Sequence, residues 1–574
     1  MKTNYKRFLT STIAMVMVGG MLQAQTQYEA ARLTDNDLNG TARFVGMGGA
    51  MSALGGDIST ISTNPAGIAL FRRNDFSTSL SLMDSKTSTD MEGVKGEDGQ
   101  TRLSFDQLGV VFSRKVSNEG SLRYFNFAMN YHKQRNFNRR MTMYGDLFGQ
   151  SLSDQIAWMG NTGPNGSYAP IALHTYDRIY GDLSTNYYGD NWRDISWLSV
   201  LGIQGGLIGP AIGSEEDFII DPETGKPLND YRPWTDADGN QYVDGDGNPL
   251  YEYNNYEGMA GHEAKYKSRE TGGVNVFDFN LSANINDRVY LGMTVGAHHV
   301  SYKRTSAYSE VGEFSGEETL YTLANSYRTE GTGVNAKFGI IVRPIEASPF
   351  RIGLAIHTPT CYELKDTHSA SLTSNVGGYD YTGSTDKAVT EYLLYTPWKF
   401  NLSLGHTIGT SIALGAEYEY TDYSSAGLHY DEEYEMEEEN TWIEEDLKGV
   451  HTFRVGMEAK LLPEFSLRAG YNYSTAAFEK SAYKWLFPNT TRTDAEYENT
   501  LARNCFTVGM GYRIGQLYLD AAYQYSCQKS EFYPFDSQYS AEVVSYPTTA
   551  DGLLPATDVK NERNQLMLTI GYRF

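Results

Sequence analysis

The sequence predicts an all-β fold, namely a transmembrane antiparallel β-barrel of 14 strands with a small N-terminal hatch, or plug, inside its lumen. Three observations predict this. Apolar and polar residues alternate with a period of two along many segments, these segments are even in number, and their connections are short and long in turn. The composition agrees, because 43 Tyr, 25 Phe and 57 Gly among 574 residues are typical of many strands with solvated connections.

Residues 1–24 are predicted to be a signal peptide. Lys2, Lys6 and Arg7 precede an apolar run, 13–22, and Ala24 is suited to cleavage. No later segment has the roughly 20 consecutive apolar residues that a membrane-spanning helix needs. The mature chain is therefore expected either to be soluble outside the cytoplasm or to cross a membrane as a barrel.

Charge and cysteine content exclude some classes of function. The formal net charge of −24 argues against nucleic acid as a partner, since binding to phosphates requires Lys and Arg. The acidic run 430–446 is interpreted as a solvated loop, with attraction of cations as the alternative. Cys361, Cys505 and Cys527 are too few for a disulfide framework. The strand phases also place Cys505 and Cys527 on opposite faces, so no bridge is expected between them.

Alternation is clearest at the C-terminus. In NQLMLTIGYRF every second residue from Leu566 to Phe574 is apolar, and the residues between them are small or polar. Spanning a bilayer takes about 9–11 tilted residues per strand. The predicted strands reach that length and extend over 74–84, 106–116, 122–143, 273–286, 288–308, 327–344, 349–365, 391–407, 410–424, 447–462, 464–477, 503–514, 516–528 and 562–574.

Short links between these strands alternate with long ones. The long links are predicted at about 85–105, 144–272, 309–326, 366–390, 425–446, 478–502 and 529–561. Outer-membrane barrels have short periplasmic turns and long extracellular loops, and closure gives every backbone group in lipid a partner. The pattern thus predicts a barrel over 74–574 with a large extracellular loop at 144–272. The segment before the first strand and the terminal Phe574 are then both periplasmic.

The apolar faces must contact lipid, so the opposite faces line the lumen. These faces carry charges of both signs, which are expected to form structural networks or to contact a plug. The residues concerned are Asp278, Lys337, Arg343, Arg351, Lys399, Glu417, Glu419, Arg454, Glu458, Arg468, Arg513, Asp520 and Arg573.

Residues 25–73 do not follow the strand pattern. They are rich in Gly and other small residues, with modest helical stretches. A folded segment of this size on the periplasmic side has one roomy place to go, which is the lumen of a barrel wide enough to leak. We therefore predict that residues 25–73 form a hatch.

The stretch NPAG ends this segment. Pro65 restricts Asn64 to extended geometry, and Asn64 can cap a short helix whose first position is Pro65. Gly67 permits close backbone approach or an unusual dihedral angle. The prediction is a rigid corner where the hatch meets the first strand.

The residues ARFVGMGGAMSALGGDISTISTNPAGIAL, 42–70, and the ending LTIGYRF resemble the FadL family of outer-membrane transporters of long-chain fatty acids and other hydrophobic compounds. The resemblance implies a hatch that plugs a fourteen-stranded barrel and is anchored by Asn64, Pro65 and Ala66, with Gly67 beside them. It also implies that the N-terminal part of the hatch, from about Gln25, moves when ligand binds.

The family's third strand carries an inward kink that opens a lateral exit toward lipid. Here the corresponding strand alternates through Tyr131 and then turns polar on both faces, at residues that include His132, Asn136 and Asn138. This pattern fits a kink or a gap, and equally a strand that leaves the membrane, which is the interpretation we favour. The long loop and the polar lumen depart from the family pattern and leave the substrate open.

Two acidic repeats lie in the long loop. Oxygen-rich clusters suit Ca²⁺, but an EF-hand loop requires Gly at its sixth position, where Gln241 and Pro249 stand. Turns that join hairpin strands are the favoured interpretation, and calcium is the alternative. No cofactor is required in either case. The candidate calcium ligands are Asp236, Asp238, Asn240, Asp244, Asp246 and Asn248.

Relatives of this kind are sometimes labelled haem receptors. His298 and His299 are adjacent on a strand and point to opposite faces, so the two cannot hold one iron, although His298 or His132 alone could be a ligand. An enzyme would need a nucleophile, base and acid on neighbouring strands, and no such constellation stands out. A general porin would need no plug, and a receptor coupled to periplasmic energy would carry a larger one.

The sequence therefore predicts a monomeric protein of the outer membrane of a Gram-negative bacterium. Its expected function is ligand-gated passive uptake of hydrophobic small molecules, with a haem-uptake receptor or a general porin as alternatives, and it is not expected to be an enzyme. Expected partners are the hydrophobic ligand, outer-membrane lipids and the assembly machinery, which reads C-terminal strands that end in Phe, here Phe574.

Overall fold

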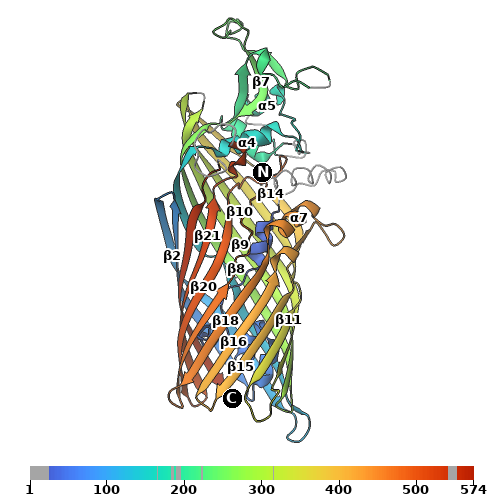
Figure 1. Ribbon diagram of the computed structural model, residues 1–574, viewed down its shortest axis with the longest axis vertical. Coiled ribbons are helices and arrows are strands. Elements are labelled where there is room, and N and C mark those ends of the chain that lie inside the picture. The colour runs from blue at the N-terminus through green and yellow to red at the C-terminus, as the bar shows by residue number, and fades with distance from the viewer. Residues whose placement is uncertain are drawn as a thin grey trace.

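The computed structural model describes residues 25–164, 166–181, 187–188, 195–221, 224–314, 316–540 and 553–574. The predicted signal peptide lies outside the described residues. The described chain forms a closed antiparallel barrel of 14 strands, with the C-terminus at its lower end in Figure 1. Closure follows from β1 (Asp75–Met91), which pairs with both β2 (Val94–Lys115) and β22 (Thr557–Arg573). The predicted fold class is confirmed.

Each strand of the wall is hydrogen-bonded to the next along the chain, and three strands are interrupted once. After β1 and β2 the wall consists of β3 (Leu122–Asn136) continued by β4 (Arg139–Gly149), β8 (Ala260–Ile285), β9 (Val289–Phe314), β10 (Glu317–Val342), β11 (Arg351–His357) continued by β12 (Cys361–Val376), β14 (Ala388–Tyr395) below which β15 (Lys399–Ile408) continues, β16 (Ile412–Asp422), β18 (Gly449–Lys460), β19 (Phe465–Ser474), β20 (Tyr497–Ile514), β21 (Leu517–Tyr533) and β22.

The period-two pattern has the predicted physical meaning. On β22 the side chains of Leu566, Leu568 and Ile570 are half exposed on the outer face, while Met567 and Thr569 between them are buried toward the lumen. In a bilayer the outer side chains contact lipid, which favours apolar residues there. None of the helices among the described residues has the length and hydropathy needed to cross a membrane.

Three of the predicted long links are wrong, because strands occupy them. The link 366–390 holds most of β12, all of β13 (Tyr379–Ser384) and the start of β14. β1 and β2 continue beyond the membrane-spanning region and meet at a two-residue turn, Glu92 and Gly93, both with positive φ. Likewise β9 and β10 extend through 309–326 as one hairpin. The outward faces of these extensions are mostly polar, so the alternation that marks a lipid-facing strand is lost there, although Tyr321 and Leu323 of β10 are buried on the inward face. The large loop is also shorter than predicted, because β4 ends at Gly149 and β8 begins at Ala260.

The large loop caps the upper end of the barrel in Figure 1. It contains α4 (Leu152–Asn161), α5 (Leu173–Gly181), α6 (Trp197–Gln204) and a small sheet of β5 (Gly209–Gly213), β6 (Tyr231–Pro233) and β7 (Tyr251–Glu257). Apolar side chains of α4 and α6, including Ile156 and Leu201, share one buried cluster with Leu372 of β12. This packing fixes the large loop to the upper end of the barrel.

Shorter elements complete the outer part. They are β13 (Tyr379–Ser384), which pairs with β12, β17 (Gly427–His429), which pairs with β14, α7 (Glu437–Asp446), and the 3₁₀ turns η4 (Glu215–Asp217), η5 (Tyr423–Ser425) and η6 (Ser537–Ser540).

Residues 25–73 lie inside the barrel as α2 (Gln27–Thr34), α3 (Ala42–Gly46), η1 (Ile58–Ser62) and η2 (Pro65–Leu70). Contacts with opposite parts of the wall place them there. The Ala42 amide donates to Thr569 Oγ1 of β22 at 2.7 Å, and the Arg351 guanidinium of β11, seven strands away, donates to the Leu54 carbonyl at 2.6 Å. We call residues 25–73 the hatch from here on.

The close fit between hatch and wall yields a prediction at Gly470. A Cβ at this position of β19 would lie 2.2 Å from the Gly48 amide nitrogen and 2.4 Å from the Met47 carbonyl carbon. Gly470→Ala should therefore displace the hatch around residues 46–50, at a cost of about 1–3 kcal/mol of docking free energy, and leave the barrel closed. Hydrogen exchange of this segment should speed up by tenfold or more.

The matched control is Ala469→Val, because this neighbouring side chain is exposed on the outer face. It should leave hatch exchange unchanged. Equal exchange rates in the two variants, with both proteins showing the gel shift of a folded barrel, would contradict the close packing at Gly470.

Candidate functional site

A cavity of about 350 Å³ lies in the lumen between the hatch and the wall. Its lining includes α2 and residues 35–39 of the hatch, lumen-facing side chains of the wall, and the connection between β19 and β20. Charged and polar residues prevail in this lining, and most of the charged groups form ion pairs with one another. The cavity is thus a polar chamber within a barrel whose outer face is apolar.

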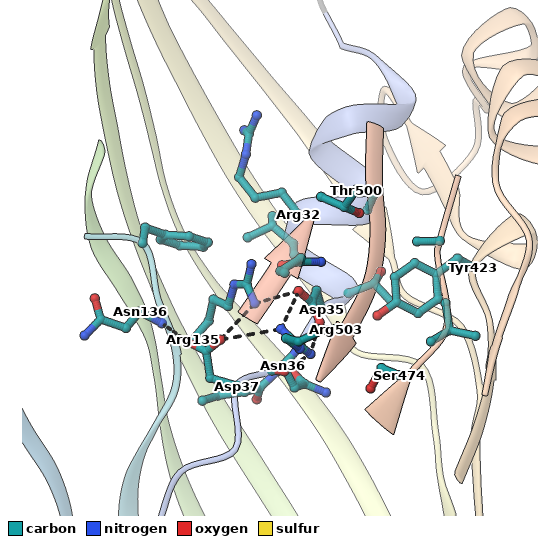
Figure 2. Close-up of a pocket in the computed structure, with 18 of the residues that line it drawn as sticks. Arg32, Asp35, Asn36, Asp37, Arg135, Asn136, Tyr423, Ser474, Thr500 and Arg503 are labelled. Atoms are coloured by element: carbon teal, nitrogen blue, oxygen red, sulfur yellow. Dashed lines mark hydrogen bonds and ion pairs between the residues drawn. The ribbon is translucent and has the colours of Figure 1, made fainter. Parts of the chain in front are cut away.

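Two hatch carboxylates form the lower ion cluster, which Figure 2 shows. Arg135 of β3 lies 2.6 Å from the Asp35 carboxylate and 2.9 Å from that of Asp37. Arg503 of β20 lies 2.8 Å from Asp35. Arg563 of β22 lies 2.9 Å from Asp37. Burial alone would raise the pKa of both carboxyls, but these arginines outweigh it and lower each pKa. The cluster ties the hatch to three strands.

An upper cluster holds α2. Arg492, in the connection between β19 and β20, is 1% exposed and lies 3.3 Å from the Glu29 carboxylate and 2.6 Å from that of Asp494. Burial would raise the pKa of Glu29, but the charges of Arg492, Arg32 and Lys484 outweigh it and hold that pKa at about 2. Glu29 therefore stays ionised at neutral pH and pairs with a loop outside the membrane-spanning strands.

Further contacts join α2 to the outer loops. The Tyr28 ring stacks on Phe478 with centroids 5.0 Å apart, and its hydroxyl donates to Asn499 Oδ1 at 2.8 Å. The Gln27 amide donates to the Asp446 carboxylate at the end of α7, also at 2.8 Å. The first helix of the hatch is thus held by two extracellular connections, those on either side of the β18–β19 pair.

The NPAG corner has the predicted local structure. Asn64 is extended and its Oδ1 accepts a hydrogen bond from the Ala66 amide at 3.1 Å, and Pro65 is the first residue of η2. Gly67 has no positive φ, so the close-approach alternative holds: a Cβ there would lie 2.4 Å from Thr60 Oγ1. The capped turn is a local consequence of these four residue types.

The wall has glycines where this corner packs against it. Added Cβ atoms at Gly292 and Gly339 would lie 2.3 Å from Pro65 and 2.1 Å from Asn64 Oδ1, respectively. Asn280 Nδ2 donates to the Pro65 carbonyl at 3.3 Å. The corner therefore presses against β8, β9 and β10, and its role as an anchor stays a prediction.

The third strand is interrupted between β3 and β4. His132 marks the last pair of the β2–β3 ladder, and the outer part of β2, 94–106, pairs with β1 alone. The β3–β8 register shifts by one residue between Lys133 and Arg135, and β4 pairs with β8 in the shifted register. The polar stretch thus lies beside a gap in the ladder and forms a kink in a strand that stays in the barrel. The interpretation favoured from the sequence, a strand that leaves the membrane, stays a prediction.

The predicted exit residues lie at this kink, and Asn136 contacts the hatch. The Asn136 amide donates to the Asp37 carboxylate at 2.9 Å, and Asn138 Nδ2 donates to Asn136 Oδ1 at 2.6 Å. The His132 side chain is buried, with Nδ1 3.4 Å from the Asp278 carboxylate. Their function in an exit stays a prediction.

Lumen charges form the predicted networks. Arg468 and the hatch residue Arg43 share the Glu458 carboxylate, at 2.6 and 2.9 Å. Lys337 of β10 pairs with Asp278 of β8 at 2.9 Å, and β9 lies between these two strands. The arginine and carboxylate residues of the upper cluster were missed, because they lie in a loop and a hatch helix that no local pattern brings together.

The six candidate calcium ligands form two turns. Asp236 Oδ1 accepts from the Asp238 and Asn240 amides at 3.0 and 2.8 Å, and Asp244 makes the equivalent contacts with Asp246 and Asn248. These contacts are typical of turns that join hairpin strands. Among the described residues, no group of three or more His, Cys, Asp or Glu side chains is arranged to hold a metal ion. Calcium binding stays a prediction.

The two single histidines that could ligate haem have protein neighbours. His298 Nδ1 lies 3.1 Å from the Tyr362 hydroxyl, and the rings of the two residues meet edge to face. His132 is close to Asp278, as described above. Both side chains therefore belong to one buried polar group of the wall.

A family model described as "Outer membrane protein transport protein (OMPP1/FadL/TodX)" matches residues 248–562, which is more than half of the chain. The chain belongs to this family. The matched range covers the barrel from the end of the large loop and does not include the hatch. Membership makes the protein one of a family of outer-membrane transport proteins rather than of enzymes.

Solved structures with a similar fold include a Pseudomonas aeruginosa FadL homologue, with 12% identity, a TM-score of 0.46, and coverage of 97% of this chain and 100% of that one. The Pseudomonas putida toluene transporter TodX has 10% identity, a TM-score of 0.42, and coverage of 94% and 99%. The Ralstonia pickettii toluene transporter TbuX has 11% identity, a TM-score of 0.41, and the same coverages. No curated protein sequence matches the chain.

The upper ion cluster yields a prediction at Glu29. Glu29→Gln should weaken the docking of α2 by about 3 kcal/mol, because it leaves the buried Arg492 without one of its carboxylate partners. Hydrogen exchange and protease cleavage at 27–34 should then increase. The same contact should respond to acid, since a lowered pKa gives a stabilisation that is complete above pH 4.5 and lost as pH falls through about 2.

Glu330→Gln is the matched control, because Glu330 forms an exposed ion pair with Arg328 on β10. It should change neither exchange at α2 nor its acid response. Unaltered protection of α2 in Glu29→Gln would show that the aromatic contacts alone hold this helix.

Proposed function

We propose that the protein is a passive, ligand-gated channel that takes up hydrophobic small molecules, such as long-chain fatty acids, across the outer membrane of a Gram-negative bacterium. The observation that carries the proposal is the hatch, which occupies the lumen of a barrel of an outer-membrane transport family and leaves a cavity beside α2. A general porin has no use for such an obstruction.

The contacts of the hatch divide it into two parts. α2 is held by ion pairs and aromatic contacts to extracellular connections, which a ligand that arrives from outside meets first. The NPAG corner is packed against glycines of the wall and is held by its own cap. We infer that ligand binding releases α2 and residues 35–39 while Asn64, Pro65, Ala66 and Gly67 keep the hatch in the barrel.

The lining of the cavity supports a ligand with a charged end. Arg32 lies over the Tyr302 ring at 4.4 Å and faces the cavity, and its nearest carboxylate, that of Glu29, is 3.6 Å away and also contacts Arg492. A fatty-acid carboxylate can pair with such a guanidinium, whereas an uncharged hydrocarbon gains nothing from it. Fatty acids therefore fit the cavity better than aromatic hydrocarbons.

The gap beside the third strand supports a lateral route as well. Asp37 of the hatch accepts from the Asn136 amide at the kink, so movement of residues 35–39 would release the contact that fills this gap. We propose that the gap is one exit, with His132, Asn136 and Asn138 at its edge.

The anchor is tested by changing its two constrained residues together. Asn64→Ala with Pro65→Ala should loosen the hatch, because the cap of η2 and the fixed φ of its first residue are both lost. We expect faster hydrogen exchange over 58–70 and ligand uptake that is altered several-fold in a folded barrel. A double change in the exposed turn between β2 and β3, Ser117→Ala with Asn118→Ala, should alter neither. Unchanged uptake in correctly inserted protein would remove this role.

Direct binding tests the function itself. A fluorescent long-chain fatty acid is titrated into detergent-purified protein and displaced by unlabelled fatty acid, an aromatic hydrocarbon or haem. We expect saturable binding that the unlabelled fatty acid competes and haem does not. Tight haem binding with a shifted absorption band, and none for fatty acid, would instead identify a haem-uptake protein.

A further inference from the structure

We propose that the barrel has a second lateral passage, distinct from the gap at the third strand. It lies at a seam where two adjacent strands are interrupted at the same height. The seam consists of residues 358–360, between β11 and β12, and residues 396–398, between β14 and β15. The inference rests on the proposed function, since the molecule that crosses the seam is the transported one.

Two prolines face each other at the seam. The register of β11 with β15 pairs His357 with Lys399, and that of β12 with β14 pairs Cys361 with Tyr395, so the same register puts Pro359 opposite Pro397. Neither proline has an amide hydrogen to give to the ladder. An antiparallel ladder alternates bonded and unbonded pairs. The Thr396 amide is directed to Thr360, so the proline pair is an unbonded one, and its two missing donors face β10 and β16. Two missing donors at one height are unusual in lipid, where every backbone group needs a partner.

Side-chain hydroxyls bridge the seam where ladder bonds are missing. The Thr360 amide donates to Thr396 Oγ1 at 2.8 Å across the seam. Beside the seam, the Ala336 amide of β10 donates to Thr358 Oγ1 at 3.0 Å, and the Thr358 amide donates to the Ala336 carbonyl at 2.9 Å. One backbone bond remains across the seam, from the Thr396 amide to the Thr360 carbonyl at 3.1 Å. Hydroxyl rotation can break the first two contacts without unfolding either strand.

In both strands, the set of alternate residues that faces the lumen also changes at the seam. Below it His357 and Lys399 face the lumen at odd positions, and above it Tyr362 and Leu394 are buried toward the lumen at even positions. The alternation of lumen-facing side chains therefore reverses in two neighbouring strands at the same height. The regular strand geometry of the wall is broken at the seam, between its lower and upper parts.

Cavities lie on both sides of this point. On the inside, Thr358, Thr360, Thr396 and Pro397 line the polar chamber. On the outside, an apolar groove of about 770 Å³ crosses β8, β9, β10, β11 and β15. Ile356 and Phe400 line this groove and lie two residues from the seam. The seam is therefore the partition between a polar chamber and a lipid-facing groove that can take an alkyl chain.

The hatch closes the inner side of the seam. His357 Nε2 lies 2.9 Å from the Thr63 carbonyl, and Asn64 Nδ2 lies 3.4 Å from the Leu354 and Ile340 carbonyls. The corner thus presses on the wall directly below the seam and behind the outer groove. The corner stays in place when α2 and residues 35–39 are released. The apolar end of a ligand in the opened chamber then moves between the two prolines into the groove.

The two passages lie in different parts of the wall. The third-strand gap separates β2 from β3 and β4, and β8, β9 and β10 stand between it and the seam. Closing one should therefore leave the other open.

A reversible staple tests the seam. In a background with Cys361, Cys505 and Cys527 changed to Ser, Pro359→Cys with Pro397→Cys puts two thiols at a directly paired position, where a disulfide can form. The protein is reconstituted in liposomes, and both binding of a fluorescent fatty acid and its transfer into the bilayer are measured. The oxidised form should transfer at least twofold more slowly than the reduced form, with equal binding, and the remaining transfer should pass through the third-strand gap.

The matched control is Val455→Cys with Tyr471→Cys, a directly paired outer-face position between β18 and β19. Its oxidation should not change transfer. Equal transfer by the oxidised and reduced seam variant would overturn the passage. Absence of binding in the unmodified protein would instead overturn the proposed function, and this inference with it.

A second measurement uses the unmodified wall and does not depend on the staple variant folding. Trp398 is 47% exposed on the outer face of the seam. A fatty acid brominated on its chain should quench Trp398 fluorescence saturably, seen as the difference between the natural chain and Trp398→Phe. Quenching that rises only in proportion to bulk lipid bromination would overturn the passage.

Discussion

The need to pair every backbone amide and carbonyl within lipid is the constraint on which the rest of this structure depends. It is met by closure: β1 pairs with β22 from Asp75 opposite Arg573 to Asp90 opposite Asp558, and the Asn74 and Phe574 backbones exchange two hydrogen bonds of 3.1 Å at the lower rim. A closed sheet of this size has no edge, but it encloses a lumen that its own side chains cannot fill.

The hatch fills that lumen, and the lumen-facing side chains are complementary to it in size and charge. Where the backbone of the hatch touches the wall, the wall has glycine, as at Gly292, Gly339 and Gly470. Where the hatch carries charge, the wall or a loop supplies the opposite charge, as for Asp35 with Arg503 and Glu29 with Arg492. Buried charges of this kind are tolerated because they are paired, and such pairs fix one position of the hatch more than they add stability.

The same constraint makes interruptions of the wall informative. A barrel in lipid has no physical reason to lose ladder bonds, yet the β2–β3 ladder stops at His132, and prolines face each other between β11 and β15. At both places the backbone is bridged by side chains and the hatch lies against the inner surface, through Asp37 in one case and Thr63 in the other. Weakness of the wall and contact with the hatch therefore coincide.

The sequence by itself determined what depends on neighbours along the chain: the apolar face of each strand, as from Leu566 to Phe574, and the capped corner at Asn64 and Pro65, where two residue types suffice. It did not reveal the outer extensions of the β1–β2 hairpin, because polar residues on both faces carry no period. Only the tertiary structure paired Glu29 with Arg492, which are 463 residues apart, and set Pro359 opposite Pro397. These contacts depend on barrel closure and strand register, which no local stretch of sequence encodes.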